Sequence, residues 1–177
     1  MMRDKDLYAQ ILGIQKPWVV REVDLDLKGG EVRVYVNHDP QVSLRCPECG
    51  AEVPGYDTRE RQWRHLDTCQ YKTILVAEVP RCRCPEHGVR QVDTPWAEPG
   101  SRLTALFEAL VIDWLREASM PAVSRRLGVS WDQIDGVMKR GVKRGLERRE
   151  EVSPRHLGAD ETSFKKRHQY VTVVQDQ

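Results

Sequence analysis

The sequence lacks any apolar run close to the roughly 20 residues that a membrane-spanning helix needs. Its start, MMRDKDLYAQ, also lacks the apolar core of a secretory signal peptide. Aromatic residues are scarce, at 7% of 177 residues, which favours modest hydrophobic cores over a single large one. We therefore expect a soluble chain of one or two domains in a reducing compartment, with no partner in the membrane.

Net charge is nearly absent as well, because 28 lysines and arginines stand against 27 aspartates and glutamates. The formal net charge of +1 gives no overall indication of a partner. The balance is uneven along the chain, however, since residues 121–149 contain eight basic and three acidic side chains, a local excess of 8 − 3 = +5. Such an excess is what the phosphate backbone of a nucleic acid attracts.

Cysteines number only five, an odd count, and they cluster in a way that is typical of metal binding. Two near-identical pentapeptides stand out, CPECG at 46–50 and CPEHG at 84–88. The two-residue gap in each lets both ligands reach one metal ion, and the following glycine lets the backbone adopt a positive φ. Four protein ligands leave no open position for water, so the pattern predicts structural rather than catalytic zinc. The expected ligands are Cys46, Cys49, Cys84 and His87.

One alternative concerns the third ligand, since Cys82 precedes Cys84 in a C-x-C pattern. The repeated C-P-E-x-G frame favours Cys84, but the sequence leaves Cys82 open as a substitute. For Cys69 and His65, between the two pentapeptides, packed or exposed side chains are expected rather than ligands. The zinc ion would stabilise hairpins that are too small to stay folded without it.

Alternating apolar residues predict a β-rich N-terminal domain with a zinc ribbon over residues 1–93. Valines and leucines at every second position, interrupted by a turn at 28–30, indicate a hairpin that leads into the first pentapeptide. A linker rich in proline and glycine is expected over 94–100. The expected elements are a short helix over 5–12 and strands over 23–27, 32–36, 59–66 and 71–80.

Beyond the linker the apolar period changes to 3.6, and residues 101–150 are expected to form a helix-turn-helix domain of three helices. Ser101 is the expected N-cap of the first helix, and Pro121 suits the first turn of the second. Val129 is expected to fill the core between the last two helices, and Ser130 to cap the third, the recognition helix.

The recognition helix determines which side chains would meet DNA. Its first residues are the ones that this geometry offers to base edges, while the basic residues from Lys139 onward suit phosphate contacts. The alternative is a plain helical bundle with a solvated basic face. The expected DNA contacts are Arg125, Arg126, Ser130, Trp131, Gln133, Lys139, Arg140, Lys143 and Arg144.

The C-terminal residues contain LGADETSF at 157–164, a basic turn at 165–168 and a β-rich run at 170–174. A carboxylate at the end of a short strand, followed by a hairpin, is how a two-metal nuclease fold begins. Paired magnesium ions need several carboxylates that converge from different strands. Taken alone, Asp160 followed by Glu161 is therefore interpreted more simply as an exposed acidic turn.

In their order along the chain, these pieces resemble the N-terminal part of bacterial insertion-sequence transposases of the ISL type. The resemblance implies a zinc ribbon, a helix-turn-helix, and over residues 155–177 the truncated start of an RNase-H-like DDE catalytic domain. It also places the first aspartate of the catalytic triad at Asp160. The motifs that carry it are LGI at 12–14, CPECG at 46–50, WRHLD at 63–67, RCPEHG at 83–88, RRLGVS at 125–130, GADE at 158–161 and HQYVT at 168–172.

The fold class expected from these observations is α+β, with the β-rich ribbon first, the three helices next and a β-hairpin last. The resemblance implies that the chain is the sequence-specific DNA-binding portion of a transposase and recognises terminal inverted repeats. The second aspartate and the glutamate of the triad would lie beyond Gln177, so we expect the chain to bind DNA and not to transpose it. Magnesium is expected only for a complete catalytic domain.

The partners implied by the resemblance are double-stranded DNA and either a second copy of the chain or a full-length transposase. The implied location is the bacterial cytoplasm, at the nucleoid. Two alternatives stay open on the sequence. One is a stand-alone repressor with a zinc ribbon and a helix-turn-helix, and the other is a zinc-stabilised protein-interaction module without a DNA role.

Overall fold

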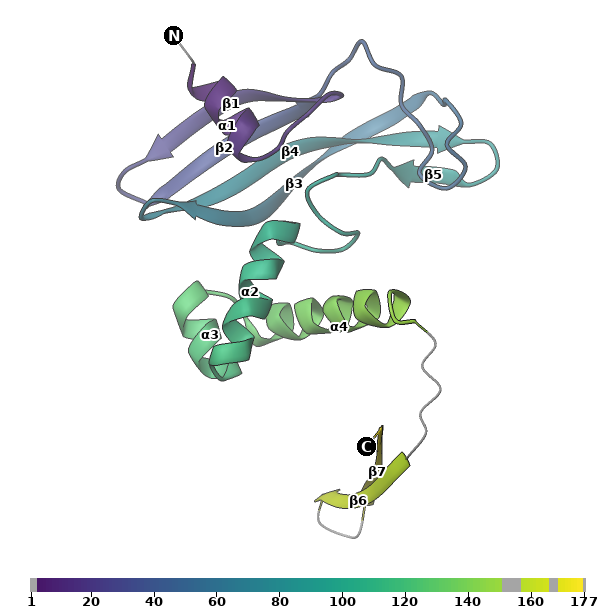
Figure 1. Ribbon diagram of the computed structural model, residues 1–177. Helices are drawn as coiled ribbons and strands as arrows, with labels where there is room; N and C mark the ends of the chain where they lie inside the picture. The colour runs from purple at the N-terminus through teal and green to yellow at the C-terminus, as the bar shows by residue number, and fades with distance from the viewer. Residues whose placement is uncertain (1–2, 151–156, 166–168, 177) are drawn as a thin grey trace. The chain divides into compact units, whose positions relative to one another are not determined.

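The computed structural model describes residues 3–150, 157–165 and 169–176 (Figure 1). The chain divides into two compact units, Met1–Gly141 and Val142–Gln177. Every helix in the described residues is too short or too polar to cross a membrane. The β-rich N-terminal region and the helices that follow it confirm the α+β fold class.

The N-terminal region is built on a five-stranded sheet. Its strands are β1 (Trp18–Asp26), β2 (Glu31–His38), β3 (Gly55–Thr68), β4 (Tyr71–Cys84) and β5 (Gly88–Gln91). They lie in the order β1-β2-β4-β3, with β5 paired to β4. Neighbouring strands are antiparallel except for β2 and β4, which run parallel. The helix α1 (Asp4–Ile11) contacts β1 (Figure 1).

The alternation of apolar residues explains why β2 and β4 form the centre of this sheet. Val34 of β2 lies opposite Leu75 of β4, and Val36 lies opposite Ala77. All four are buried, because every second residue of a strand faces the core. Strands β3 and β4 are 14 residues each and extend beyond the expected bounds. Their extra length carries the chain from the core to the cysteine-rich turns.

The segment predicted as a linker, residues 94–100, takes part in the N-terminal core through Trp96. Its indole packs edge-on against Trp18, with 4.8 Å between ring centroids, and against Trp63 at 5.4 Å. All three tryptophans are buried. Proline and glycine therefore predict the irregular backbone of this segment correctly, but they do not indicate that Trp96 packs into the core of the sheet.

Three helices follow, α2 (Ala105–Glu117), α3 (Met120–Leu127) and α4 (Trp131–Glu147). Pro121 stands in the first turn of α3, as expected. The helices enclose a second hydrophobic core that is separate from that of the sheet. Its buried members are Leu103, Phe107, Val111, Val123, Val129, Ile134 and Val137.

The prediction that Ser101 caps the first of these helices was wrong, because Thr104 is the N-cap of α2. The Thr104 hydroxyl accepts a hydrogen bond from the backbone N–H of Phe107, at 3.3 Å. Ser101 is buried three residues earlier, and its hydroxyl oxygen accepts a hydrogen bond from the backbone N–H of Leu103. Either residue type suits an N-cap, so the choice depends on where the chain leaves the sheet.

That point is a junction between residues 102–104 and strand β3. The backbone N–H of Arg64 donates to the carbonyl of Arg102, and the N–H of Thr104 donates to the carbonyl of Arg64. Nδ1 of His65 lies 2.9 Å from the Thr104 hydroxyl, and both side chains are buried. Thr104 thus caps α2 and binds the sheet with the same oxygen.

The second unit contains the end of α4 and a hairpin of β6 (Leu157–Lys165) and β7 (Gln169–Asp176). The predicted strand over 170–174 falls within β7. Most of the predicted basic turn, residues 166–168, lies outside the described residues.

The junction makes stability depend on pH through His65. Burial, and then the charge of Arg64, lower the pKa of His65 from 6.5 to about 4. The unfolded chain takes up this proton near pH 6.5, whereas the folded chain resists it until about pH 4. His65 therefore costs no stability above pH 6.5 and weakens the fold progressively as the pH falls from 6.5 to 4.

We expect the free energy of unfolding to fall between neutral pH and pH 4 by roughly 2–3 kcal/mol more in the native chain than in His65→Gln. The glutamine can still hydrogen-bond Thr104 but does not titrate. Urea unfolding at a series of pH values measures both profiles. Parallel profiles would show that His65 does not carry this pH dependence.

Candidate metal centre and DNA interface

The first cysteine-rich turn is a small hairpin between β2 and β3. Arg45 and Glu52 form an antiparallel bridge, and the N–H of Val53 donates to the carbonyl of Leu44. Inside it, Gly50 has a φ of 72°, so the chain can curl back and its N–H can donate to the carbonyl of Cys46. The curl brings both cysteines of this turn to one side.

The second turn joins β4 to β5 and has the same construction. Cys84 pairs with Gly88, whose φ is 69°. The N–H of Arg83 donates to the carbonyl of Pro54, which connects β4 to the chain that leaves the first turn. Positive φ angles at both glycines were expected from the repeated pentapeptide, and the structure confirms them.

The four predicted ligands come together where these turns meet. Cys49 Sγ lies 3.8 Å from Cys84 Sγ, and His87 Nδ1 lies 3.5 Å from Cys84 Sγ and 3.8 Å from Cys46 Sγ. All four ligand atoms lie within 4.8 Å of one another. Tetrahedral zinc, with bonds of about 2.3 Å to sulfur and about 2.0–2.1 Å to nitrogen, places its ligand atoms about 3.5–3.8 Å apart. The cluster therefore fits a zinc ion with no position left for water.

Backbone amides support the thiolate form of one ligand. The N–H of His87, followed by the His87 side chain, lowers the pKa of Cys84 from 9.0 to about 6. A thiolate is the form that binds metal, and N–H groups directed at the sulfur stabilise it. The turn thus prepares its cysteine for the metal through backbone N–H groups and through the His87 side chain.

The other candidate ligands lie elsewhere. Cys82 is buried outside the cluster, with Sγ 3.9 Å from the carbonyl of Arg45, and burial raises its pKa. Cys69 is exposed in the turn between β3 and β4, where its φ is 56°. His65 is buried in the junction. Only the predicted set of Cys46, Cys49, Cys84 and His87 is arranged for a metal ion in the part of the chain that the structure describes.

A helix-turn-helix is formed by α3, the turn at 128–130 and α4. Gly128 ends α3 with a φ of 65°, and the Ser124 hydroxyl donates to the carbonyl of Val129. Val129 is buried in the helical core, as predicted. The backbone N–H of Gln133 donates to the Ser130 hydroxyl, which confirms Ser130 as a cap. In return, the backbone N–H of Ser130 donates to the side-chain carbonyl of Gln133, so this side chain is engaged at the start of the helix.

The predicted DNA contacts lie in several different environments. Arg125 and Arg126 are exposed at the end of α3, and the Arg126 guanidinium lies 5.7 Å from the Trp114 ring centroid. Trp131 is 57% exposed at the start of α4. Lys139 and Lys143 are exposed one turn apart on α4 and form ion pairs with Asp135 and Glu147. Arg144 is half-buried.

Arg140 has a different environment, because its guanidinium is directed at Glu108 of α2. Arg140 is 24% exposed and Glu108 only 2%, with 2.6 Å between Nη2 and Oε1. The Ser101 hydroxyl lies 2.7 Å from the same carboxylate oxygen. A Cβ atom at Gly136 would lie 3.2 Å from Arg140 Nη1, so a glycine on α4 leaves room for this guanidinium. The sequence does not indicate this network, because its members are 32 and 39 residues apart.

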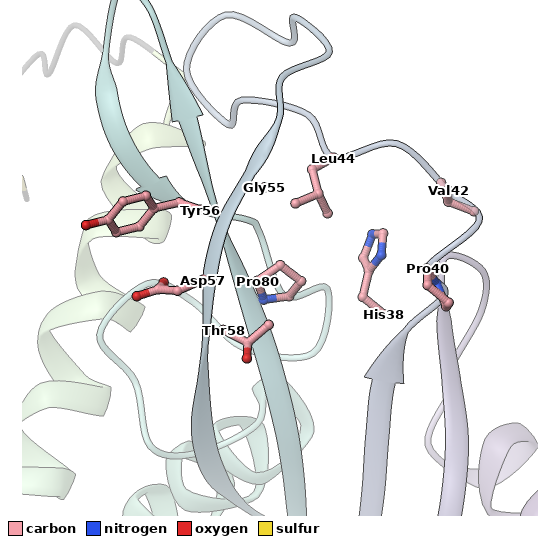
Figure 2. A pocket seen from close by; sticks show the side chains of 9 residues that line it. All are labelled: His38, Pro40, Val42, Leu44, Gly55, Tyr56, Asp57, Thr58 and Pro80. Carbon is pink, nitrogen blue, oxygen red and sulfur yellow. The ribbon is translucent and has the colours of Figure 1, made fainter.

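A hollow of about 410 Å³ lies beside the first cysteine-rich turn (Figure 2). Figure 2 shows His38 and Leu44 on one side of strand β3 and Asp57 projecting on the other. Asp57 is bound by Arg81, whose hydrogen bond lowers the pKa of the carboxyl. The imidazole of His38 lies 3.0 Å from the carbonyl of Asp39. The hollow therefore does not pair His38 with Asp57 for acid–base chemistry.

Asp160 lies on β6 opposite Val173, and its side chain is exposed. A two-metal site requires several carboxylates that converge on the ions. Within residues 3–150, 157–165 and 169–176, the cysteine and histidine cluster is the one group arranged for a metal ion. The catalytic role assigned to Asp160 by resemblance stays a prediction.

A zinc-ligand cluster at the mouths of two hairpins, followed by a helix-turn-helix, defines a class of DNA-binding protein. Residues 43–87 match the family model described as the zinc-finger of transposase IS204/IS1001/IS1096/IS1165. Residues 92–142 match the helix-turn-helix domain of transposase family ISL3. The chain thus carries the zinc ribbon and the helix-turn-helix domain of the ISL3 transposase family.

The chain is also similar to the transposase for insertion sequence element IS1557 from two strains of Mycobacterium tuberculosis, CDC 1551/Oshkosh and ATCC 25618/H37Rv. The identity to each is 34% over 184 residues, which covers 99% of this chain. The chain spans 41% of the length of these curated relatives. No solved structure matches it.

The metal centre predicts different outcomes for two cysteines on the same strand. We expect Cys84→Ser to lose zinc and cooperative unfolding of the sheet, because structural zinc contributes on the order of 10 kcal/mol of binding free energy. Cys82→Ser, the matched control, should retain one zinc per chain. Zinc content and thermal unfolding measure both. If Cys84→Ser retained zinc and Cys82→Ser lost it, Cys82 rather than Cys84 would be the zinc ligand.

The buried network predicts that Arg140 contributes more to the free energy of unfolding than the adjacent Lys139 does. We expect Arg140→Ala to lower the free energy of unfolding by about 3 kcal/mol, because it removes the cation that faces a buried carboxylate. Lys139→Ala also breaks an ion pair, but an exposed one, and should lower the free energy of unfolding far less. Urea unfolding compares them, and equal losses would contradict a structural role for Arg140.

Proposed function

We propose that this chain binds double-stranded DNA by placing α4 in the major groove, with the zinc ribbon as a metal-stabilised support. The observation that carries this proposal is the geometry of the turn at 128–130. Gly128, Val129 and the Ser130 cap fix α4 against α3 and leave the start of α4 exposed. This is the arrangement in which a recognition helix contacts base edges.

The preferred sequence in this proposal is the terminal inverted repeat of the element that encodes the chain. The similarity to transposases of insertion sequences supports this preference. Because two ends must be brought together, the proposed partners are a second copy of the chain or a full-length transposase. Asp160 is proposed as the first carboxylate of a magnesium-dependent catalytic site that a complete catalytic domain would finish.

Base contacts are proposed for Trp131 and for the carboxylates near it, and phosphate contacts for Arg125, Arg126 and the exposed lysines. Carboxylates can accept a hydrogen bond from cytosine N4 in the major groove. Asp132 and Asp135 are exposed at the start of α4 and suit this role. Arg140 is not included among the proposed phosphate contacts, because its guanidinium already binds Glu108.

The test of the proposed function is binding of the zinc-loaded chain to duplexes cut from the DNA that flanks its gene. Scrambled duplexes of equal length at the same salt concentration are the control. Preference for the inverted-repeat end supports the proposal in full. Equal and salt-sensitive binding supports only the general DNA contact, and a lack of binding to either duplex would favour the protein-interaction module.

Phosphate binding also predicts how the affinity depends on salt. We expect the double variant Lys139→Ala and Lys143→Ala to reduce the slope of log affinity against log salt by up to about 1.8, or about 0.9 for each phosphate that the protein no longer neutralises. Binding should weaken to a similar degree for flanking and scrambled duplexes. Fluorescence anisotropy over a salt series measures the slope, and an unchanged slope would exclude this face of α4 from the interface.

A further inference from the structure

The start of α4 has little positive charge for a surface that approaches DNA. Between Trp131 and Lys139 it carries two carboxylates, Asp132 and Asp135, against the single ammonium of Lys139. That ammonium lies 2.7 Å from Asp135. Since phosphate attraction supplies much of the affinity of DNA-binding proteins, a further cation beside this helix end would strengthen binding.

Arg102 occupies such a position. It lies in the segment between Trp96 and α2, and it lines a hollow of about 180 Å³ together with Asp132, Gln133 and Gly136 of α4. Those three residues belong to the first two turns of the helix. The segment therefore runs along one side of α4, at the end that a helix-turn-helix presents to the groove.

The Arg102 side chain is exposed and available. Within the part of the chain that the structure describes, it forms neither a hydrogen bond nor an ion pair. Arg140 lines the same hollow, but its guanidinium is bound to Glu108 and half withdrawn from solvent. Of the two arginines at this hollow, Arg140 therefore stabilises the fold and Arg102 can bind a ligand.

The backbone of Arg102 is held more firmly than an exposed loop would be. Its carbonyl accepts from the N–H of Arg64 at 2.9 Å, and the neighbouring Ser101 and Thr104 are buried. Ser101 binds Glu108, which in turn binds Arg140 of α4. The position of Arg102 relative to α4 is therefore set by interactions on both of its sides.

We infer that Arg102 binds a DNA phosphate beside the recognition helix, a contact that deepens the proposed function and rests on it. The major groove is about 12 Å wide and phosphates line both of its edges, so a cation beside a helix in the groove faces one of these edges. Guanidinium binds phosphate oxygens through paired N–H donors. The contact positions the protein on DNA without selecting a base.

The test compares Arg102→Ala with two matched variants of the full, zinc-loaded chain. The probe is a duplex of arbitrary sequence, titrated over a salt series. We expect Arg102→Ala to lower the salt slope by about 0.9 and to weaken binding, with its unfolding midpoint unchanged because the side chain is exposed. Arg102→Lys should keep the slope, since it retains one cation.

Arg21→Ala is the charge-matched control. Arg21 is exposed on β1 and lines a hollow with Glu22, Glu60 and Glu78, so it faces carboxylates rather than α4. We expect its salt slope to equal that of the native chain. Equal changes in Arg21→Ala and Arg102→Ala would show a general charge effect and overturn the inference.

Failure of this inference differs from failure of the proposed function. A native slope in Arg102→Ala, together with a reduced slope in the lysine double variant, would reject the Arg102 contact and keep α4 as the DNA-binding helix. A reduced slope in Arg102→Ala supports the contact. A native chain that does not bind the duplex at any salt concentration would overturn both.

Discussion

Residues 102–104 pair with the edge of β3, and the placement of the helices depends on this pairing. Arg64 exchanges backbone hydrogen bonds with Arg102 and Thr104, while His65 meets the Thr104 hydroxyl in a buried contact. Because Thr104 is also the N-cap, α2 begins where the sheet ends. The carboxylate of Glu108, one turn later, then fixes α4 through Arg140. A few interactions thus connect the sheet to the recognition helix without a large shared core.

The metal centre could be predicted from the sequence because its information is local. Two residues separate the ligands of each pair, and Gly50 and Gly88 mark the backbone curl that each turn needs. The strands and the helix-turn-helix were likewise visible in their periods of two and 3.6. The order of the strands in the sheet could not be predicted in this way, because the parallel pairing of β2 with β4 joins segments about 40 residues apart. The ion pair of Glu108 with Arg140 could not be predicted either, because the sequence shows only two opposite charges 32 residues apart.

The two halves of the proposed interface are stabilised by different means. The sheet has a core of valines and tryptophans, but its cysteine-rich ends extend beyond that core and depend on four metal ligands. The helix-turn-helix has its own apolar core and one buried ion pair. Buried ion pairs seldom stabilise a fold more than apolar packing would, and this pair connects α2 to α4. Such a division suits the proposed function, in which α4 is held steady against DNA.

The C-x-C spacing in β4 has a consequence for metal binding. Cys82 and Cys84 are two residues apart on one strand, so both lie on the same face of β4, and both are buried. Only Cys84 is three residues from His87, and only Cys84 joins the ligand cluster. The turn from β4 to β5, rather than the face of the strand, therefore selects the thiol that meets the metal ion.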